Sequence, residues 1–177
     1  MMSKNNIKNL LAEEGSCDGV FFYCFYYQLV AEFIQTYDDI SKVKTEIDFI
    51  VQQLASDIIN EYLVRFFSPD LFENELEILR HIILTIPELY FGVKVEQTDL
   101  KLNCVTCNYI DYSEQFFPLD QELFVNFSLK KFVNQVLKQI FLLLSVDIEI
   151  YARGPNTFMF VLTKLNDETS EPESKRT

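Results

Sequence analysis

Cysteine and histidine are the residues of this sequence that could bind a metal ion. Cys104 and Cys107 stand three positions apart, a spacing that also occurs in zinc sites. Structural zinc needs four ligands, however, and Cys17, Cys24 and the single histidine His81 do not form a second pair at usable spacing. We therefore interpret Cys104 and Cys107 as two thiols on a strand, and we expect neither a metal nor another cofactor.

The sequence also lacks the pairing of a nucleophile with a base that covalent catalysis needs. His81 lies in a helical pattern, and no serine or cysteine stands at a fixed spacing from it, so we interpret it as a structural or surface residue. No glycine-rich phosphate-binding loop is present. Acidic residues gather in two short stretches, which we interpret as solvated helix ends or faces: Asp38, Asp39, Glu73, Glu75 and Glu77. These observations predict a protein that is not an enzyme.

Charge and composition narrow the possible partners. The 177 residues carry a formal net charge of -12, which argues against binding to nucleic acid or to an anionic membrane surface, because both require a basic face. With 17 Phe, 9 Tyr and only 4 Gly, the chain favours helices and bulky packing. The cysteines do not resemble a secreted framework, so we expect a reducing cytosol. The apolar stretch 20–30 is too short to span a membrane as a helix.

The spacing of apolar residues predicts four helices. The first covers 19–37 and is apolar on more than one side, so we expect part of it to be covered by another molecule. The second covers 42–67, and the third begins near Asp70 and ends at Pro87. The long apolar stretch 123–144 predicts the fourth helix.

Alternating apolar residues and turn residues predict four strands. The first begins in the segment 89–95, and a second, bulged strand covers Leu100 to Tyr109. Alternation in 146–152 and 157–165, on either side of the turn 153–156, predicts a closing hairpin. The resulting fold class is α+β: three N-terminal helices and one later long helix pack on a small antiparallel four-stranded sheet.

The length of the chain fits one domain. We expect that domain to cover 19–165. The polar residues 1–18 are predicted to form a mobile leader, and residues 166–177 a disordered tail.

Several short stretches match those of one known family in their order and spacing. They are 26–30 (Tyr-Tyr-Gln-Leu-Val), Tyr37, 43–48, 63–65 (Leu-Val-Arg), 89–93 (Leu-Tyr-Phe-Gly-Val), 116–118 (Phe-Phe-Pro) and the closing hairpin. Through these stretches, about residues 20–165 of the chain resemble the small-subunit family of the transport protein particle (TRAPP) tethering complex. The resemblance is to the subunit 3 branch, with the subunit 6 branch also possible.

The resemblance implies a non-enzymatic scaffold subunit that helps to tether vesicles in transport from the endoplasmic reticulum (ER) to the Golgi. Together with other subunits it would support nucleotide exchange on a Rab-type GTPase. In the resembling complex a C-terminal segment of subunit 3 reaches that GTPase, whereas the composition of residues 166–177 favours an inert solubilising end. The implied location is cytoplasmic, at cis-Golgi and ER membranes, with membrane association only through the complex. The implied partners are other TRAPP-type subunits, in a homodimer or heterodimer through the first two helices. The expected interface residues are Phe21, Phe25, Tyr26, Leu29, Phe33, Ile50, Leu54 and Ile58.

The chain departs from the subunit 3 branch at the cysteine that this branch acylates. No cysteine occurs between Cys24 and Cys104, and Asp70 and Leu71 stand near the expected place, so we expect no thioester there. The apolar channel of the branch should then be narrowed or filled by phenylalanine. Bulkier residues also replace glycines at helix-packing positions, which should change the helix separations: Val51, Ala55, Phe132 and Val136.

An alternative function is a small-molecule sensor, because related folds enclose an apolar ligand. A large apolar cavity between the last helix and the sheet would favour a sensor. A flat apolar face on the first two helices would favour the scaffold.

Overall fold

The computed structural model describes residues 19–63, 74–101, 103–110 and 126–163. The predicted leader and tail, and the expected acylation position near Asp70 and Leu71, lie outside these residues. The helices are α2 (Gly19–Thr36), α3 (Ile40–Ile58), α5 (Glu75–Phe91) and α7 (Leu129–Leu143), and a π-helical turn (Ile59–Leu63) follows α3. The strands are β1 (Lys94–Lys101), β2 (Cys104–Ile110), β3 (Ile148–Ala152) and β4 (Thr157–Leu162).

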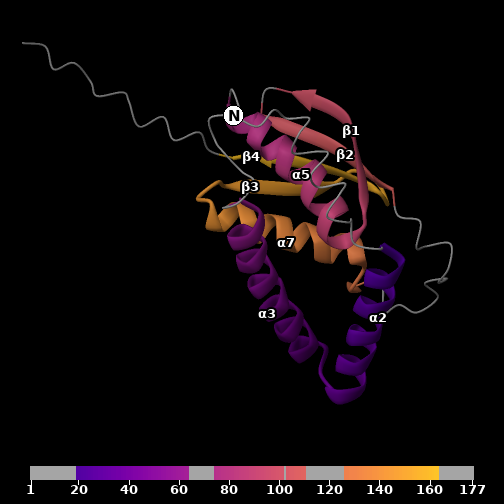
Figure 1. The fold of residues 1–177 in the computed structure, drawn as a ribbon. Helices are drawn as coiled ribbons and strands as arrows, with labels where there is room; N and C mark the ends of the chain where they lie inside the picture. The colour runs from indigo at the N-terminus through magenta and orange to yellow at the C-terminus, as the bar shows by residue number, and fades with distance from the viewer. Residues whose placement is uncertain (1–18, 64–73, 102, 111–125, 164–177) are drawn as a thin grey trace, which may run out of the picture.

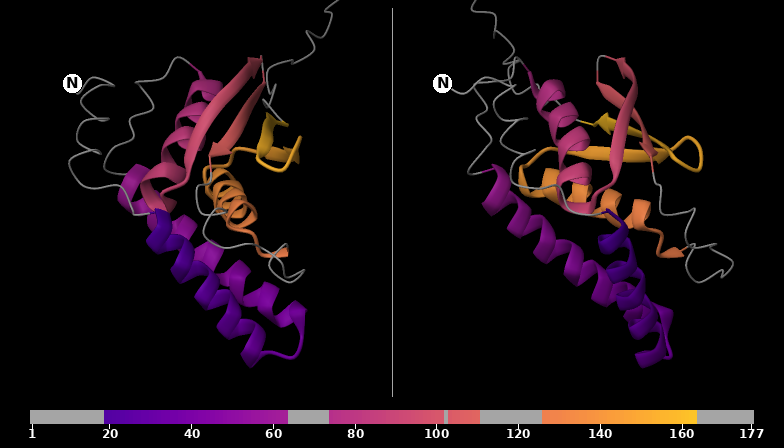
Figure 2. Two further views of the ribbon diagram at one scale, coloured as in Figure 1. Left: turned by 90° about the vertical axis from the view of Figure 1, so that its right-hand side faces the viewer. Right: turned by 45° about the vertical axis from the view of Figure 1, so that its right-hand side comes forward.

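The architecture is α+β, which confirms the predicted fold class. Within the described residues, α2, α3 and α5 precede an antiparallel sheet of four strands, and α7 connects its two hairpins. α5 packs against β1 and β2, whereas α7 packs against β3 and α3. α2 and α3 form a helical hairpin that projects away from the strands (Figure 1). The two helices meet at one end and diverge toward α7, which crosses their open end, as the right view of Figure 2 also shows.

One face of the sheet is buried beneath the helices. The strand order is β1-β2-β4-β3, so β2 and β4 are the central strands. Their side chains alternate, and the inward ones are almost fully buried, among them Val105, Cys107 and Tyr109 on β2 and Phe158 and Phe160 on β4. This alternation is the period-2 pattern of a sheet with one covered face.

The closing hairpin is confirmed. β3 and β4 pair from Ile148 with Leu162 to Ala152 with Phe158. The turn begins where the Arg153 amide donates to the Thr157 carbonyl at 2.8 Å.

The boundary between the first two strands was predicted wrongly. Leu100 belongs to β1, which ends when Lys101 pairs with Cys104. Apolar residues continue to alternate across this tight connection, so the sequence pattern did not reveal it. The bulge lies in β1, because Thr98 is skipped in the pairing and its hydroxyl donates to the Thr106 carbonyl at 3.2 Å.

Pro87 does not end the third helix, contrary to the prediction. It lies inside α5, which continues to Phe91. Proline removes one N–H donor, but the residues after it keep their own, and the Gly92 amide donates to the Glu88 carbonyl at 3.2 Å. The helix ends at Gly92 because that residue adopts a left-handed conformation, with φ of 62°. The segment 89–91 is therefore helical, and β1 begins only at Lys94.

Side-chain caps fix where the helices begin. The Asp39 carboxylate accepts from the Ser41 amide at 2.8 Å, so α3 starts slightly before the predicted position. Asn74 caps α5 in the same way, through the Glu77 amide at 3.0 Å. Ser128 caps α7, which begins at Leu129 and is shorter than the predicted 123–144 helix. None of the helices in the described ranges is long and apolar enough to cross a membrane.

Two polar side chains of α7 tie this helix to the sheet. Asn134 is buried and accepts a hydrogen bond from the Tyr109 hydroxyl of β2 at 2.7 Å. The buried Lys130 donates to the side chain of Asn156, at the turn of the closing hairpin. These bonds fix α7 beneath both hairpins, since a buried polar group is costly unless it is paired.

Candidate interaction surface and pocket

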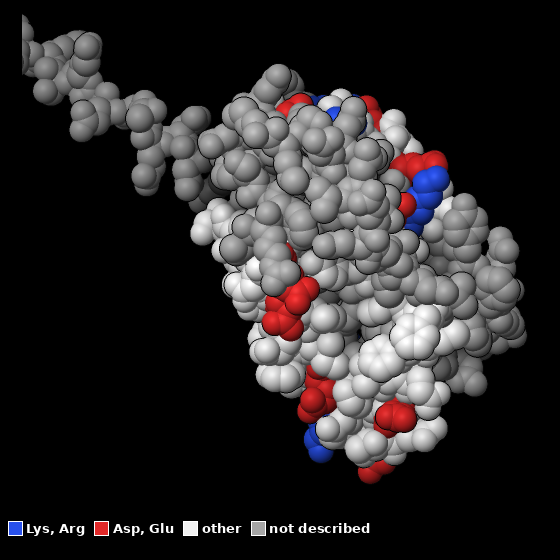
Figure 3. Space-filling view, in the orientation of Figure 1, with Lys and Arg blue, Asp and Glu red and all other residues white. Residues whose placement is uncertain are grey.

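α2 exposes aromatic side chains along one stripe. Phe21 is 71% exposed and Phe25 57% exposed, and both lie on the same side of the helix because they are four residues apart. Glu32 is the sole charged residue between Gly19 and Thr36. Accordingly, the surface over α2 is nearly free of charged groups, and aromatic rings stand open on it (Figure 3). We call Phe21 and Phe25 the α2 aromatic pair.

The predicted interface residues divide into three groups by exposure. The α2 aromatic pair is exposed, and Tyr26 and Ile58 are buried in the core of their own chain at 2% and 1% exposure. The others are half-buried: Leu29, Phe33, Ile50 and Leu54. Tyr26 and Ile58 have almost no surface left for a partner, so an interface would depend on the other six.

Aromatic contacts attach α2 to the rest of the domain. The ring of Phe22 meets that of Phe91 on α5 edge to face, with ring centroids 5.1 Å apart. The ring of Tyr26 packs against that of Phe132 on α7 at 4.7 Å. Burial raises the pKa of the Tyr26 hydroxyl above its usual value. Phe132 and Val136, which we noted in place of family glycines, are both buried, as are Val51 and Ala55 on α3.

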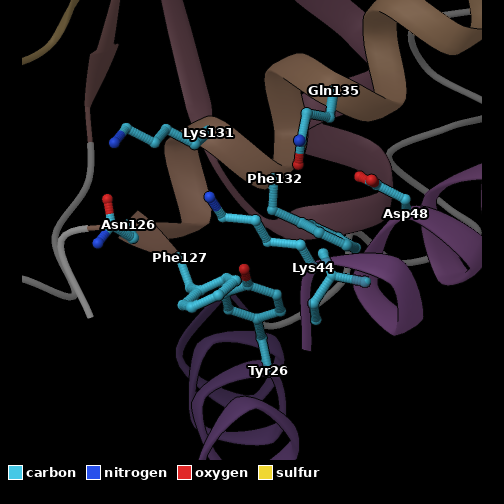
Figure 4. Close-up of a pocket in the computed structure, with 9 residues that line it drawn as sticks. Tyr26, Lys44, Asp48, Asn126, Phe127, Lys131, Phe132 and Gln135 are labelled. Atoms are coloured by element: carbon cyan, nitrogen blue, oxygen red, sulfur yellow. The ribbon is translucent and has the colours of Figure 1, made fainter. Parts of the chain in front are cut away.

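A pocket of about 220 Å³ lies where α2, α3 and the start of α7 meet (Figure 4). Its apolar wall is formed by Tyr26, Ile47, Phe127 and Phe132. Its polar lining consists of Lys44, Asp48, Asn126, Lys131 and Gln135. The pocket could not be recognised in the sequence, because its residues come from three separate segments that no local spacing links.

Cys104, Cys107 and His81 are packed within the fold. Cys104 and Cys107 are free, buried thiols on β2, and burial raises the pKa of Cys107 to about 12. His81 Nε2 lies 3.0 Å from the Tyr62 hydroxyl, and the two rings are stacked. Within the described residues, no three His, Cys, Asp or Glu side chains come together as a metal site would require. Cys24 is exposed on α2.

Three of the acidic residues identified in the sequence, Asp39, Glu75 and Glu77, lie at helix starts. Asp39 caps α3, and the hydrogen bond from the Ser41 amide lowers its pKa. Glu77 lies in the first turn of α5, where a negative charge is favourable. Glu73 lies outside the described residues, and Asp38 is exposed.

Comparison with known proteins identifies the fold. No family model matches this chain, and no curated protein matches it. Among solved structures, the chain is similar to the crystal structure of a trafficking protein particle complex subunit 3 from Naegleria fowleri, which is covalently bound to palmitic acid. The TM-score is 0.61 at 12% sequence identity, and the match covers 83% of this chain and 96% of that chain. The two proteins therefore share a fold over most of their length.

Proposed function

We propose that this protein is a non-enzymatic interaction subunit of a TRAPP-like vesicle-tethering complex. The fold shared with a subunit 3 protein supports the proposal. The observation that carries it is the α2 aromatic pair, because two phenylalanines stand exposed on a helix with a single charged residue. Exposed apolar patches of this kind are typical of surfaces that bind another protein.

The partner in this proposal is a second small subunit, either another copy or a related chain, bound through α2 and α3. Transfer of one exposed phenyl ring from water into an interface stabilises the complex by roughly 1.5–3 kcal/mol. Phe49 on α3 is 58% exposed and would extend the apolar surface beyond the interface residues predicted from the sequence. The half-buried residues named above would form the remainder.

We further propose that the assembled complex supports nucleotide exchange on a Rab-type GTPase in ER-to-Golgi transport. The protein would then be cytoplasmic and peripheral at cis-Golgi and ER membranes. Both the subunit 3 and the subunit 6 branches are compatible with this role. The net charge of -12 favours basic or neutral partner surfaces.

Light scattering coupled to size-exclusion chromatography tests the interaction surface. We expect the purified chain to associate at micromolar concentration, and Phe21→Ser with Phe25→Ser to weaken association at least tenfold while the circular dichroism spectrum stays unchanged. Leu142→Ser is the matched control, because Leu142 is 65% exposed but lies on α7. A clean monomer that also fails to retain any small TRAPP-type subunit would refute the proposal.

Affinity purification from the source cells followed by mass spectrometry tests the finer assignment. We expect other TRAPP-type subunits to co-purify with the wild type and to be lost with the α2 double variant. Reconstitution with those subunits should accelerate nucleotide release from a Rab-type GTPase. Deletion of 166–177 should leave assembly intact and slow that exchange if the tail reaches the GTPase.

A further inference from the structure

The pocket between α2, α3 and α7 combines an aromatic wall with two lysines. Phe127 is 5% exposed and Phe132 2% exposed, so their rings form fixed surfaces within the folded chain. The hydroxyl of Tyr26 points into the same space (Figure 4). A volume of about 220 Å³ is enough for one aromatic ring with a short substituent, since a cavity of about 150 Å³ in another protein binds benzene.

The polar groups of the pocket are separated by sign. Figure 4 shows the side chain of Lys44 running over the aromatic wall, with its ammonium group on the side of Asn126 and Lys131. Asp48 and Gln135 lie on the opposite side. Two lysines on one rim are notable in a chain with 15 basic and 27 acidic residues. One side of the pocket is therefore suited to a negative charge.

The backbone also favours a negative charge on this side of the pocket. Residues 126–132 include the start of α7, whose N-terminal end carries a partial positive charge from its aligned peptide dipoles. The Tyr26 hydroxyl is available as a hydrogen-bond donor, because a tyrosine with the ordinary pKa of 10.0 is protonated at neutral pH and burial only raises the pKa of this one.

We propose that this pocket binds a small organic anion that has one flat apolar ring and one carboxylate or similar acidic group. The ring packs against Phe127 and Phe132, and the acidic group lies between Lys44 and Lys131. This inference does not depend on the proposed assembly, because every residue that it uses belongs to a single chain.

NMR titration of the full chain tests the pocket, with phenylacetate as the probe. We expect a dissociation constant on the order of 1 mM, as suits a ligand of about ten non-hydrogen atoms. Amide signals of residues 44–48 and 126–135 should shift in a saturable way. Phenylacetamide has nearly the same shape but no charge, so it should bind at least about threefold more weakly.

Substitutions of the lysines and of Asp48 at the pocket rim should change the affinity for phenylacetate in opposite directions. Lys44→Gln and Lys131→Gln should each weaken phenylacetate binding about threefold, and the double variant about tenfold. Asp48→Asn should strengthen binding about twofold, since it removes a like charge. The matched control is Lys138→Gln, an exposed lysine farther along α7 that does not line the pocket. All four positions are exposed, and circular dichroism of each variant checks that it is folded.

The following outcomes of these experiments would contradict the proposal. Absence of saturable shifts up to about 10 mM phenylacetate would show that the pocket does not take this class of ligand. Equal binding of phenylacetamide, or lysine variants that bind like the wild type, would show that the charge is not recognised. Inorganic phosphate that competes as well as phenylacetate would show that the aromatic wall plays no part.

Discussion

α2 and α7 are both long and apolar, yet the domain covers them very differently. α7 is buried along nine of its 15 residues, between α3, α5 and β3. On α2 the buried side chains between Phe21 and Thr36 are Tyr23, Tyr26 and Val30. α2 is nevertheless the more apolar in composition, with one charged residue against three lysines on α7. An apolar composition therefore predicts that a helix is buried. It does not tell whether the helix is buried by its own chain or by a partner.

The two helices also differ in how they use polar groups. Asn134 and Lys130 on α7 are buried and bonded to the sheet, which fixes that helix in one position. α2 is held by ring contacts such as that between Phe22 and Phe91, and the Tyr27 hydroxyl is hydrogen-bonded to the backbone of Leu129 at the start of α7. The polar contacts of α7 therefore reach the sheet, whereas this polar contact of α2 reaches only the neighbouring helix.

The largest expected difference between the two helices comes from truncating one phenylalanine on each. Phe132→Ala on α7 should lower the free energy of unfolding by about 3–5 kcal/mol, because it removes a buried ring that packs against Tyr26 and Phe91. Phe25→Ala on α2 should change it by less than about 0.5 kcal/mol in dilute protein. Urea unfolding measures both, and comparable losses would mean that α2 is as tightly packed as α7.

A smaller loss in the free energy of unfolding is expected when one buried hydroxyl is removed. Tyr109→Phe should cost about 1–3 kcal/mol, because the buried Asn134 loses the hydroxyl that it accepts from. Adding Asn134→Leu should cost less than the sum of the two single changes. The control is Tyr37→Phe at the end of α2, since the Tyr37 hydroxyl donates to Glu46 at 3.3 Å near the surface. A loss from Tyr37→Phe equal to that from Tyr109→Phe would remove the distinction between the two regions.

Alkaline pH should weaken the packed region through its buried thiol. Cys107 has a pKa of about 12 when folded and an ordinary value of 9.0, so above pH 9 the unfolded chain releases a proton that the folded chain keeps. The unfolded state then binds fewer protons, and stability falls as pH rises from about 9 toward 12. The buried Tyr62, raised to about 12, adds to the same trend from pH 10 upward.

Urea midpoints between pH 8 and 10 measure this trend at the onset of the thiol effect. Cys107→Ala should lower the midpoint at pH 8, because it empties part of the core, yet flatten its decline above pH 9. An unchanged slope in the variant would exclude Cys107 as the source.

The smallest effect is expected at the exposed tip of the α2–α3 hairpin. Asp39→Ala removes the cap of α3, which should slightly lower the thermal midpoint at neutral pH. The hydrogen bond from the Ser41 amide lowers the pKa of Asp39, so its contribution is present above the ordinary value of 3.8 and is lost as pH falls below it. The thermal midpoints of wild type and variant should therefore converge toward pH 2. A gap that persists there would show that the carboxylate charge is not what stabilises the cap.

Local patterns in the sequence were sufficient for elements that depend on local chemistry. The closing hairpin is an example, because alternation and the turn at 153–156 determine it within one short segment. The end of α5 was missed because Pro87 breaks helices in general, whereas here Gly92 sets the boundary. The order of the four strands was not predicted, because it depends on how the two hairpins meet.

The candidate sites show the same limit. Phe21 and Phe25 could be identified because their exposed stripe repeats at helical spacing. The pocket could not, because Tyr26, Lys44 and Lys131 are brought together only when three helices pack. Two residues of the predicted interface, Tyr26 and Ile58, are buried because helical spacing alone does not distinguish a core face from a partner face.

The pairing of β2 with β4 determines when the sheet can be completed during synthesis. Asn108 pairs with Thr157, and a hydrogen bond of 2.7 Å joins their side chains across 49 residues of sequence. At about 5–20 residues per second, the ribosome needs roughly 2–10 seconds to deliver that partner. The β1–β2 hairpin can form within microseconds. For the remaining seconds, the edge of β2 that later pairs with β4 has no partner strand. Until the second hairpin arrives, this unpaired edge of β2 is open to pairing with a strand of another chain.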